Sequence, residues 1–534
     1  MRVYQPFFKN IFKKRKELLN QRNEDDIAAP IKKRRIHFIP FSKVAGKLFL
    51  IYVLVVLISG FLLCIPGVVY NGARDITDGS GTPLGQYDFR WNFLIGLFTA
   101  SSAFSDTGLT IPVTAADYTF FGQLIIIILI QFGGFGVLTF KIMILVLLGR
   151  KISIKDRMLV QGERGNNSFG HTLDLIKSSF YFLIIVEVIA AILLFFNFYF
   201  SPGSTAGKFM IDNVTYHRFW ASLWSGVFHS ISAINNAGFD IVGNSSLMPY
   251  NTNYFLQFIF MIEFVMGGIG FPTFYDIKRK IAAWKRKEKV KFSLFTKINF
   301  ISYSLVSIVG VFLVWLVEYV NLNMTTMDAF GNTVYIETIL RDAPTKWNGF
   351  MNILFNTMST RNAGFSTIDC TKLLPGSRAI MSIMMFIGSA PSSTAGGIRT
   401  TTFAIVLITI WSIMRNNNSV NAFKRKIPNE TVKRALVVTI ISVMLVGGTV
   451  LGISIENPTL DYLNILFVVC SAFGTTGLNT FNFLQTYGLG AFSLLLLIAN
   501  MFIGQLGISS TLLVSIKGTG DKEYSYVEED VTIG

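Results

Sequence analysis

The chain has 534 residues, of which 51% are hydrophobic and only 15% are charged, and its mean hydropathy is +0.51. An average soluble domain carries about 25% charged residues, so this composition excludes an ordinary water-soluble protein and indicates one embedded in lipid. The net charge of +16 would also suit a nucleic-acid-binding protein, but the basic residues lie beside apolar runs. Cys64, Cys370 and Cys470 have no C-x-x-C spacing and indicate neither a disulfide nor a metal site.

Eight apolar runs reach or approach the roughly 20 residues that a helix needs to cross a bilayer. They cover residues 48–69, 123–148, 180–200, 255–271, 301–319, 379–414, 435–453 and 489–516. Lysine and arginine cluster at 1–40, 150–164, 278–297 and 415–434, whereas the intervening connections hold only scattered cases. Because Lys and Arg are retained on the cytoplasmic side of short loops, we expect a multi-pass plasma-membrane protein with both termini cytoplasmic and no nucleic-acid partner.

Between these runs the chain repeats one short motif four times. The copies are 102–109 (SAFSDTGL), 232–239 (SAINNAGF), 359–365 (STRNAGF) and 471–478 (SAFGTTGL). Each copy ends an apolar stretch too short to cross a bilayer and is followed, after a polar interval, by a longer one. Non-helical backbone survives at membrane depth only where it is buried in protein or lines water. The repeats therefore predict an all-α membrane protein of four fused helix, pore-loop and helix units around a pseudo-four-fold pore.

The same repeats set the predicted domain boundaries. A basic cytoplasmic N-terminus (1–40) precedes pore repeats 1 (41–150), 2 (151–285), 3 (286–415) and 4 (416–517), and a cytoplasmic tail covers 518–534. All four motifs would open to the same side of the membrane. This layout differs from that of a secondary carrier built from two inverted halves.

A glycine stands next to last in each copy of the motif. Glycine adopts positive φ and lets backbones approach closely, and rings of backbone carbonyls can replace the hydration shell of a cation. The predicted ion-binding residues of this selectivity filter are Asp106, Thr107, Gly108, Asn236, Ala237, Gly238, Asn362, Ala363, Gly364, Thr475, Thr476 and Gly477. A tight turn or helix C-cap is the alternative for any single copy. Asp106 could concentrate cations at the mouth or hold the loop from behind, and the sequence leaves both open.

These residues resemble the Trk, Ktr and HKT superfamily of potassium transporters, most of all the bacterial Ktr or Trk membrane subunit. The similar motifs are 131–136 (QFGGFG), 230–239 (SISAINNAGF), 267–272 (GGIGFP), 360–369 (TRNAGFSTID) and 526–534 (YVEEDVTIG). The resemblance implies potassium uptake, a homodimer and a cytosolic ring of RCK-type nucleotide-binding regulatory subunits. In that family, a glycine in all four filter loops accompanies potassium selectivity, and a serine in place of the first glycine accompanies sodium permeation. A sodium or mixed sodium/potassium transporter of this fold, or a secondary carrier with broken helices, is the alternative.

A further feature lies inside the long apolar run 379–414. Its middle consists of Gly388, Ser389, Ala390, Pro391, Ser392, Ser393, Thr394, Ala395, Gly396 and Gly397. A helix interior loses about 1 kcal/mol for each Gly and about 3 kcal/mol for Pro relative to Ala, so we expect this stretch to unwind. The resemblance makes it an intramembrane gating loop, and a kinked helix packed through small residues is the alternative. Gln505 stands where the bacterial family usually has an arginine below the filter, so closure would rely more on the loop.

Acidic residues within spans are candidates for function because charge is costly there. We note Glu187 and Glu263, which would serve sodium or proton coupling or, as we favour, have a partner inside the bundle. No enzyme constellation is present: residues 165–172 have phosphate-loop spacing, but His171 replaces the required lysine. His229 is expected to be a packing residue. We therefore expect no cofactor in this chain, with potassium as substrate and nucleotide only on a regulatory partner.

Overall fold

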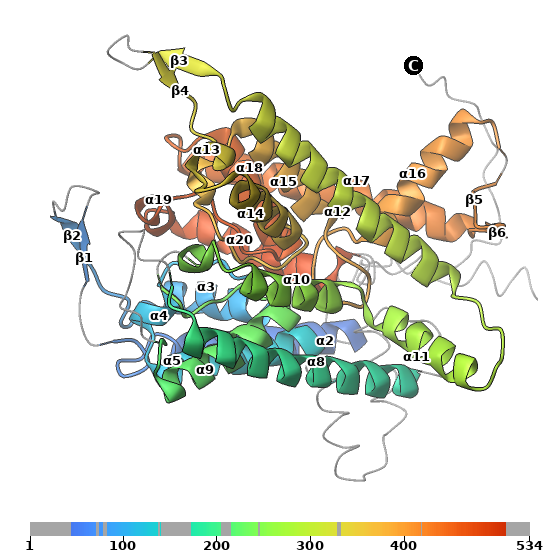
Figure 1. Cartoon of the computed structure of the whole chain (residues 1–534), viewed down its shortest axis with the longest axis horizontal. Coiled ribbons are helices and arrows are strands. Elements are labelled where there is room, and N and C mark those ends of the chain that lie inside the picture. The colour runs from blue at the N-terminus through green and yellow to red at the C-terminus, as the bar shows by residue number, and fades with distance from the viewer. Residues whose placement is uncertain are drawn as a thin grey trace, which may run out of the picture. The chain divides into compact units, whose positions relative to one another are not determined.

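The computed structural model describes residues 44–70, 74–77, 83–136, 139, 172–203, 215–243, 246–327, 333–417 and 419–508, and it is mainly helical (Figure 1). The basic N-terminus, the basic segment 150–164, most of the phosphate-loop-like segment and the tail 518–534 lie outside the described residues.

The first two repeats each contain a long helix, a shorter helix that ends in the motif, and a second apolar helix. In repeat 1 the elements are α2 (Val44–Leu62), the hairpin β1 (Arg74–Thr77) and β2 (Pro83–Tyr87), α3 (Phe93–Phe104), α4 (Thr114–Asp117) and α5 (Phe120–Phe135). In repeat 2 they are α8 (Thr172–Phe200), α9 (Phe219–Ile234), the 3-10 turn η1 (Met248–Tyr250), α10 (Tyr254–Gly268) and α11 (Phe271–Lys285).

The last two repeats follow the same order. Repeat 3 holds α12 (Leu294–Val320), the hairpin β3 (Thr325–Met327) and β4 (Thr333–Tyr335), α13 (Ile339–Asp342), α14 (Lys346–Ser359), η2 (Cys370–Lys372), α15 (Pro375–Ile387) and α16 (Thr400–Met414). Repeat 4 holds the hairpin β5 (Asn421–Ala422) and β6 (Arg425–Lys426), α17 (Asn429–Glu456), α18 (Tyr462–Gly474), α19 (Phe483–Tyr487) and α20 (Ala491–Leu506).

The short helices α3, α9, α14 and α18, which we call the pore helices, begin at definite residues. Three of them are capped by the side chains of Asn92, Thr345 and Asp461, each of which accepts a hydrogen bond from the backbone N–H three residues on. Such a cap satisfies one of the N–H groups that a helix start leaves without a partner. Each pore helix packs on the long helix before it, in the pairs α2 with α3, α8 with α9, α12 with α14 and α17 with α18.

Contacts between repeats close into a ring. The second helix of each repeat packs on the pore helix of the next: α5 on α9, α10 on α14, α15 on α18, and α20 back on α3. This cyclic order brings the four repeats around one centre, as a pseudo-four-fold arrangement requires. The predicted fold class, an all-α membrane protein of four helix, pore-loop and helix units, is confirmed.

Three of the described helices are long and apolar enough to cross a bilayer by length and composition: residues Lys177–Phe200, Leu294–Val320 and Asn429–Glu456. The pair α10 and α11 makes a fourth if it counts as one span, but it is bent by 96°. The expected continuous span 255–271 is thus wrong at its end, because Gly270 has a φ of 87° and Pro272 follows at the start of α11. The count of eight spans stays a prediction, since 137–138, 140–148 and 509–516 lie outside the described residues.

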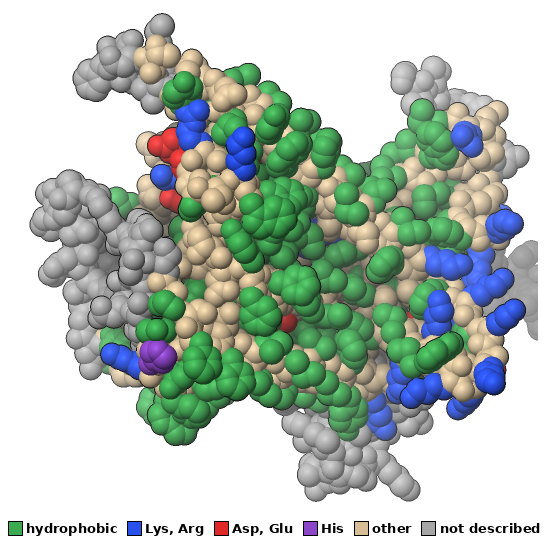
Figure 2. Space-filling model, in the orientation of Figure 1, with side chains coloured by type: hydrophobic (Ala, Val, Ile, Leu, Met, Phe, Trp, Pro, Cys, Tyr) green, Lys and Arg blue, Asp and Glu red, His purple; other side chains and the backbone are tan. Residues whose placement is uncertain are grey.

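The surface fits a lipid environment. Large apolar side chains of the long helices face outward; Ile185, Val188, Ile308 and Met444, for example, are 54–70% exposed. Figure 2 shows a face dominated by hydrophobic side chains, with Lys and Arg gathered at the end that holds α11 and the β5–β6 hairpin. The hairpins β1–β2 and β3–β4 lie at the opposite end (Figure 1).

Candidate ion pathway

Four glycines converge where the pore helices end. A Cβ atom built on Gly108 would lie 2.6 Å from the carbonyl oxygen of Ala237, and one built on Gly238 would lie 3.0 Å from that of Ala363. The remaining two contacts, Gly364 with the Thr476 oxygen and Gly477 with the Thr107 oxygen, are closer still. Each glycine therefore abuts the carbonyl that precedes the glycine of the next repeat, in the cyclic order 1, 2, 3, 4, 1.

The four loops share one backbone conformation. The glycines have φ values of 70–96°, and the residue two positions before each of them is also left-handed: Asp106, Asn236, Asn362 and Thr475. Asn and Asp tolerate this conformation better than most residues. The N–H of the residue before each glycine donates back to the pore helix, at 2.7–2.8 Å to the carbonyls of Ser102, Ser232, Ser359 and Ser471. The third copy is one residue shorter between that serine and its glycine.

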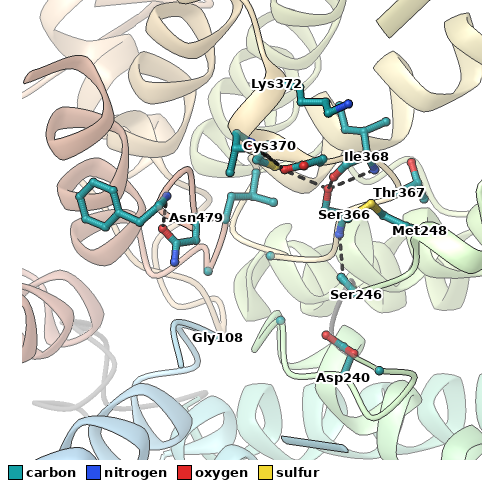
Figure 3. Close-up of a pocket in the computed structure, with 18 of the residues that line it drawn as sticks. Gly108, Asp240, Ser246, Met248, Ser366, Thr367, Ile368, Cys370, Lys372 and Asn479 are labelled. Carbon is teal, nitrogen blue, oxygen red and sulfur yellow. Dashed lines mark hydrogen bonds between the residues drawn. The ribbon is translucent and has the colours of Figure 1, made fainter. Parts of the chain in front are cut away.

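Two cavities lie among the four repeats. One has a volume of about 790 Å³ and is lined by all four glycines and by the segments that follow them. Figure 3 shows Gly108, Asp240, Ser246, Ser366 and Asn479, which come from four different repeats, around this cavity. The other, of about 430 Å³, is lined by Ser105, Gly133, Gln505 and part of the segment 391–399. We call the first the vestibule and the second the lower cavity.

The electrostatics of the site favour a cation. All four pore helices direct their C-terminal ends, which carry partial negative charge, into the loops that form the ring. Asp240 lies in the vestibule wall, and burial raises the pKa of this carboxyl to about 7, although hydrogen bonds from the backbone of Val242 and Gly243 and from Ser246 oppose the shift. Asp342, Asp369 and Lys372 also line the vestibule.

The predicted break in the third repeat is present. α15 ends at Ile387 and α16 begins at Thr400, and the residues between them, 388–399, form a loop whose ends touch. Gly388 and Gly397 have φ values of 66° and 85°, and a Cβ built on Gly388 would lie 3.0 Å from the Cα of Gly397. The kinked-helix alternative is therefore wrong, because the backbone leaves the helix altogether.

Backbone groups of this loop are satisfied by the break between α10 and α11. The N–H of Ala390 donates to the Gly268 carbonyl at 3.1 Å, and the N–H of Phe271 donates to the Ser392 carbonyl at 2.9 Å. Thr394 Oγ1 donates to the Gly267 carbonyl at 3.3 Å. Two interrupted helices thus supply each other with the hydrogen-bond partners that lipid cannot provide.

The loop also contacts three of the four left-handed residues of the ring directly: Asn236, Asn362 and Thr475. Ser389 Oγ donates to Asn362 Oδ1 at 2.7 Å, and the Asn236 amide lies 3.3 Å from Thr394 Oγ1. A Cβ built on Gly396 would lie 2.7 Å from Thr475 Oγ1. Contact with the first repeat runs through another residue.

That residue is Gln505. Its Nε2 donates to Asp106 Oδ2 at 3.1 Å and to the Thr394 carbonyl at 3.0 Å, so one amide joins the first filter loop to the loop of repeat 3. Asp106 is fully buried and is not among the residues that line the vestibule. The geometry thus places the Asp106 carboxyl behind the ring, on the side of the lower cavity.

The sequence analysis missed three charged residues, of which Arg361 and Glu318 are fully buried and Arg399 is partly buried. Arg361 is fully buried; its Nη1 donates to the Met384 carbonyl at 3.3 Å, and its guanidinium lies 4.8 Å from the Tyr303 ring centre. Arg399 lines the lower cavity. Glu318, inside the predicted span 301–319, is also fully buried, and its Oε1 accepts a hydrogen bond from Ser377 Oγ at 2.7 Å. The sequence analysis named only Glu187 and Glu263 as acidic residues within spans, so it missed this third one. A charge within an apolar run is the signal that would have found Glu318 and Arg399, which lie in the runs 301–319 and 379–414, whereas Arg361 lies in the third motif and gave no such signal.

The two carboxylates identified from the sequence lie behind the second filter loop. Glu263 Oε1 accepts from Ser230 Oγ at 2.6 Å, and Glu187 Oε2 accepts from Gln131 Nε2 at 3.1 Å. Gln131 in turn accepts from Asn235 at 2.7 Å. Both therefore have partners inside the bundle, as we favoured.

His229 was expected to be a packing residue, and the cysteines were expected to form neither a disulfide nor a metal site. His229 Nδ1 lies 2.7 Å from the Ser225 carbonyl, and its Nε2 accepts from the Ile241 N–H at 3.3 Å, so it fixes the segment after the filter. The three cysteines are free and buried.

Fold and site together define an integral membrane protein of the transporter class. A family model described as TrkH, cation transport protein, matches residues 79–525, and the chain belongs to this family. It is therefore a transporter and not an enzyme, and the resemblance seen in the motifs is confirmed.

Similar proteins and a solved structure agree with this family assignment. The Ktr system potassium uptake protein D of Bacillus subtilis is 32% identical over 91% of this chain and 96% of that protein. The cation transporter MG322 of Mycoplasma genitalium is also 32% identical, over 92% of this chain and 97% of that protein. The crystal structure of the potassium transporter TrkH from Vibrio parahaemolyticus matches with a TM-score of 0.60 at 15% identity, covering 92% of this chain and 88% of that one, which shows a shared fold.

Proposed function

We propose that this chain carries potassium into the cell across the plasma membrane through the ring of backbone carbonyls beside Gly108, Gly238, Gly364 and Gly477. The observation that carries the proposal is the cyclic contact of each glycine with the carbonyl of the next repeat. Carbonyl rings of this kind replace the hydration shell of a monovalent cation. The potassium uptake named for the Bacillus relative, and glycine at all four positions, favour potassium over sodium.

Cations would enter from the vestibule and leave through the lower cavity. The end that holds α11 and the β5–β6 hairpin is rich in Lys and Arg (Figure 2), and the positive-inside rule places such an end in the cytoplasm. We therefore assign the vestibule to the outside and both termini to the inside. The four same-way repeats packed in cyclic order do not fit a carrier with two inverted halves.

The loop 388–397, with Gln505, would close this pathway. It contacts the base residue of the ring in the second, third and fourth repeats directly and that of the first through Gln505. Opening would require the loop to leave these contacts. We assign control of that movement to a cytosolic ring of RCK-type nucleotide-binding subunits, and we expect the chain to form a homodimer. Light scattering of the detergent-solubilised protein, alone and with its partner, measures both assemblies.

A substitution in the first filter loop tests the proposal. Gly108→Ser places a side chain 2.6 Å from the Ala237 carbonyl, and we expect it to raise sodium uptake relative to potassium uptake in vesicles that hold the purified protein. Gly67→Ser is the matched control, because Gly67 has a φ of 93° but no atom near its Cβ position. Unchanged selectivity in a folded Gly108→Ser protein would refute the filter assignment. Sodium preference in the wild type would favour the alternative, a sodium transporter of the same fold.

A further inference from the structure

Two carboxyl groups in repeat 2 lie outside both cavities. Glu263 in α10 is fully buried and Glu187 in α8 is 9% exposed, and neither lines the vestibule or the lower cavity. The ion pairs formed by the described residues include neither of them. An ionised carboxylate at such a place lacks both water and a counter-charge, which is strongly unfavourable.

The hydroxyl of Ser230, in the pore helix α9, lies between the two residues. Its Oγ is 2.8 Å from the backbone carbonyl of Glu187 and 2.6 Å from Glu263 Oε1, and both are hydrogen-bond distances. A serine hydroxyl has one hydrogen to donate, and neither a backbone carbonyl nor an ionised carboxylate has any. With Ser230 as the donor to an ionised Glu263, the Glu187 carbonyl would therefore face a hydroxyl with no hydrogen left. A protonated Glu263 satisfies both contacts, because it donates to Ser230 while Ser230 donates to the Glu187 carbonyl.

The other groups around Glu263 favour the same state. Its Oε2 is buried without a hydrogen-bond partner among the described residues, which is less unfavourable for the carbonyl oxygen of a neutral acid than for a charged oxygen. Within the described part of the chain, the charged group that acts on Glu263 is Glu187, which has the same sign. His229 in α9 is uncharged, because one ring nitrogen faces a carbonyl and the other accepts from a backbone N–H. The helix α14, which also packs on α10, has Lys346 as its one titratable residue, at its exposed start.

The same cluster holds the second filter loop. The Glu187 side chain accepts from Gln131 Nε2 at 3.1 Å, and Gln131 Oε1 accepts from Asn235 Nδ2 at 2.7 Å. Asn235 is the residue at which α9 ends and the filter loop begins. A second negative charge on Glu263 would repel Glu187 and leave the Ser230 contacts one hydrogen short, so the end of this pore helix would be held less firmly.

We propose that Glu263 holds a proton at neutral pH and, as a hydrogen-bond donor to Ser230, is a positioning residue for the second filter loop. The ligand of this site is a proton, which needs no cavity, and not a metal ion. The positioning role rests on the proposed function, since it takes the second filter loop to be part of the ion pathway. The protonation of Glu263 does not depend on that function.

Infrared spectroscopy of the purified full chain in vesicles tests the proton directly. At about pH 7, where an ordinary glutamate is ionised, the wild-type spectrum minus that of Glu263→Gln should contain the C=O stretching band of a protonated carboxyl group. Asp88→Asn is the matched control, because Asp88 forms an exposed ion pair with Arg90, and its difference spectrum should contain carboxylate bands only. Carboxylate bands alone in the Glu263→Gln difference spectrum would overturn the proposal.

Rubidium uptake by the same vesicles tests the positioning role. The amide of Glu263→Gln can still donate to Ser230, so we expect uptake within about twofold of the wild type. Glu263→Leu removes the donor and Ser230→Ala removes the hydroxyl, and each should lower uptake about tenfold and weaken the preference for potassium over sodium. Equal losses in Glu263→Gln and Glu263→Leu, or wild-type uptake in Glu263→Leu, would overturn the positioning role; if Glu263→Leu does not fold, Ser230→Ala takes its place. Unaltered selectivity in Gly108→Ser would remove the filter assignment but would leave the infrared band, and the proton on Glu263, unaffected.

Discussion

A methyl group on the third filter glycine should abolish most transport. Gly364 has a φ of 80°, and a Cβ at this position would lie 2.9 Å from the Cα of Gly238 and closer still to the Thr476 carbonyl oxygen. That oxygen belongs to the ring. Gly364→Ala should therefore act on backbone conformation and on the proposed ion coordination at once.

The expected loss of transport in Gly364→Ala follows from two free-energy costs. A left-handed backbone costs an L-residue about 1–2 kcal/mol, and forcing an extra methyl into a packed site costs about 1–3 kcal/mol. The only relief is to displace the Thr476 carbonyl or the Gly238 backbone, so most of this cost appears as lost ion coordination. At a factor of ten for every 1.4 kcal/mol, a loss of about 2 kcal/mol reduces transport by about thirtyfold.

Two glycines elsewhere provide controls for the same substitution. Gly67 has a φ of 93° with nothing near its Cβ position, so Gly67→Ala carries the backbone strain alone. Gly447, in the long helix α17, has neither positive φ nor a close neighbour, and alanine there should be neutral or slightly stabilising. Rubidium uptake per folded protein should fall for Gly364→Ala only. Wild-type uptake by folded Gly364→Ala would refute the claim that these carbonyls coordinate the ion.

Three further changes probe the gate and the vestibule. Ser389→Ala removes the 2.7 Å bond to Asn362; a loss of about 1 kcal/mol in loop anchoring should raise basal rubidium uptake about fivefold, and unchanged uptake would contradict this. Gln505→Arg adds a second cation beside Arg399 and should lower potassium flux in vesicles, whereas equal or greater flux would remove Gln505 from the pathway. Asp240, with its pKa raised to about 7, is protonated below that pH and charged above it. Uptake at low salt should therefore rise about twofold between pH 6 and 8, and Asp240→Asn should flatten this rise.

The four filter loops could be predicted from the sequence because each is marked by a short motif that recurs in every repeat. Four motifs with a glycine at the same place define the loops, and their glycines lie together in space. The loop 388–397 was accessible for a similar reason, since glycine and proline inside an apolar run break a helix whatever surrounds it. Whether these residues bind and gate potassium stays a prediction for the assays above. So do the domain boundaries.

The contacts between these loops could not be predicted from the sequence. Gln505 and Asp106 lie 399 positions apart, and Asn362 donates to the Gly474 carbonyl across 112 positions. No periodicity connects such pairs. The sequence analysis did not predict the bend between α10 and α11, although Gly270 and Pro272 mark it. The motif 267–272, which contains both residues, was used only as evidence of the family resemblance.

The loop's contacts bear on the proposal that a partner opens the pathway. Hydrogen bonds join the loop to α10, to α11, to two filter loops and, through Gln505, to α20. Each contributes about 1 kcal/mol, so together they hold the closed state by several kcal/mol. Moving a two-state element from about 1% to about 99% open needs about 5.5 kcal/mol of differential binding. Under the proposed gating, that energy would come from a partner, and the chain alone should show only a small basal flux.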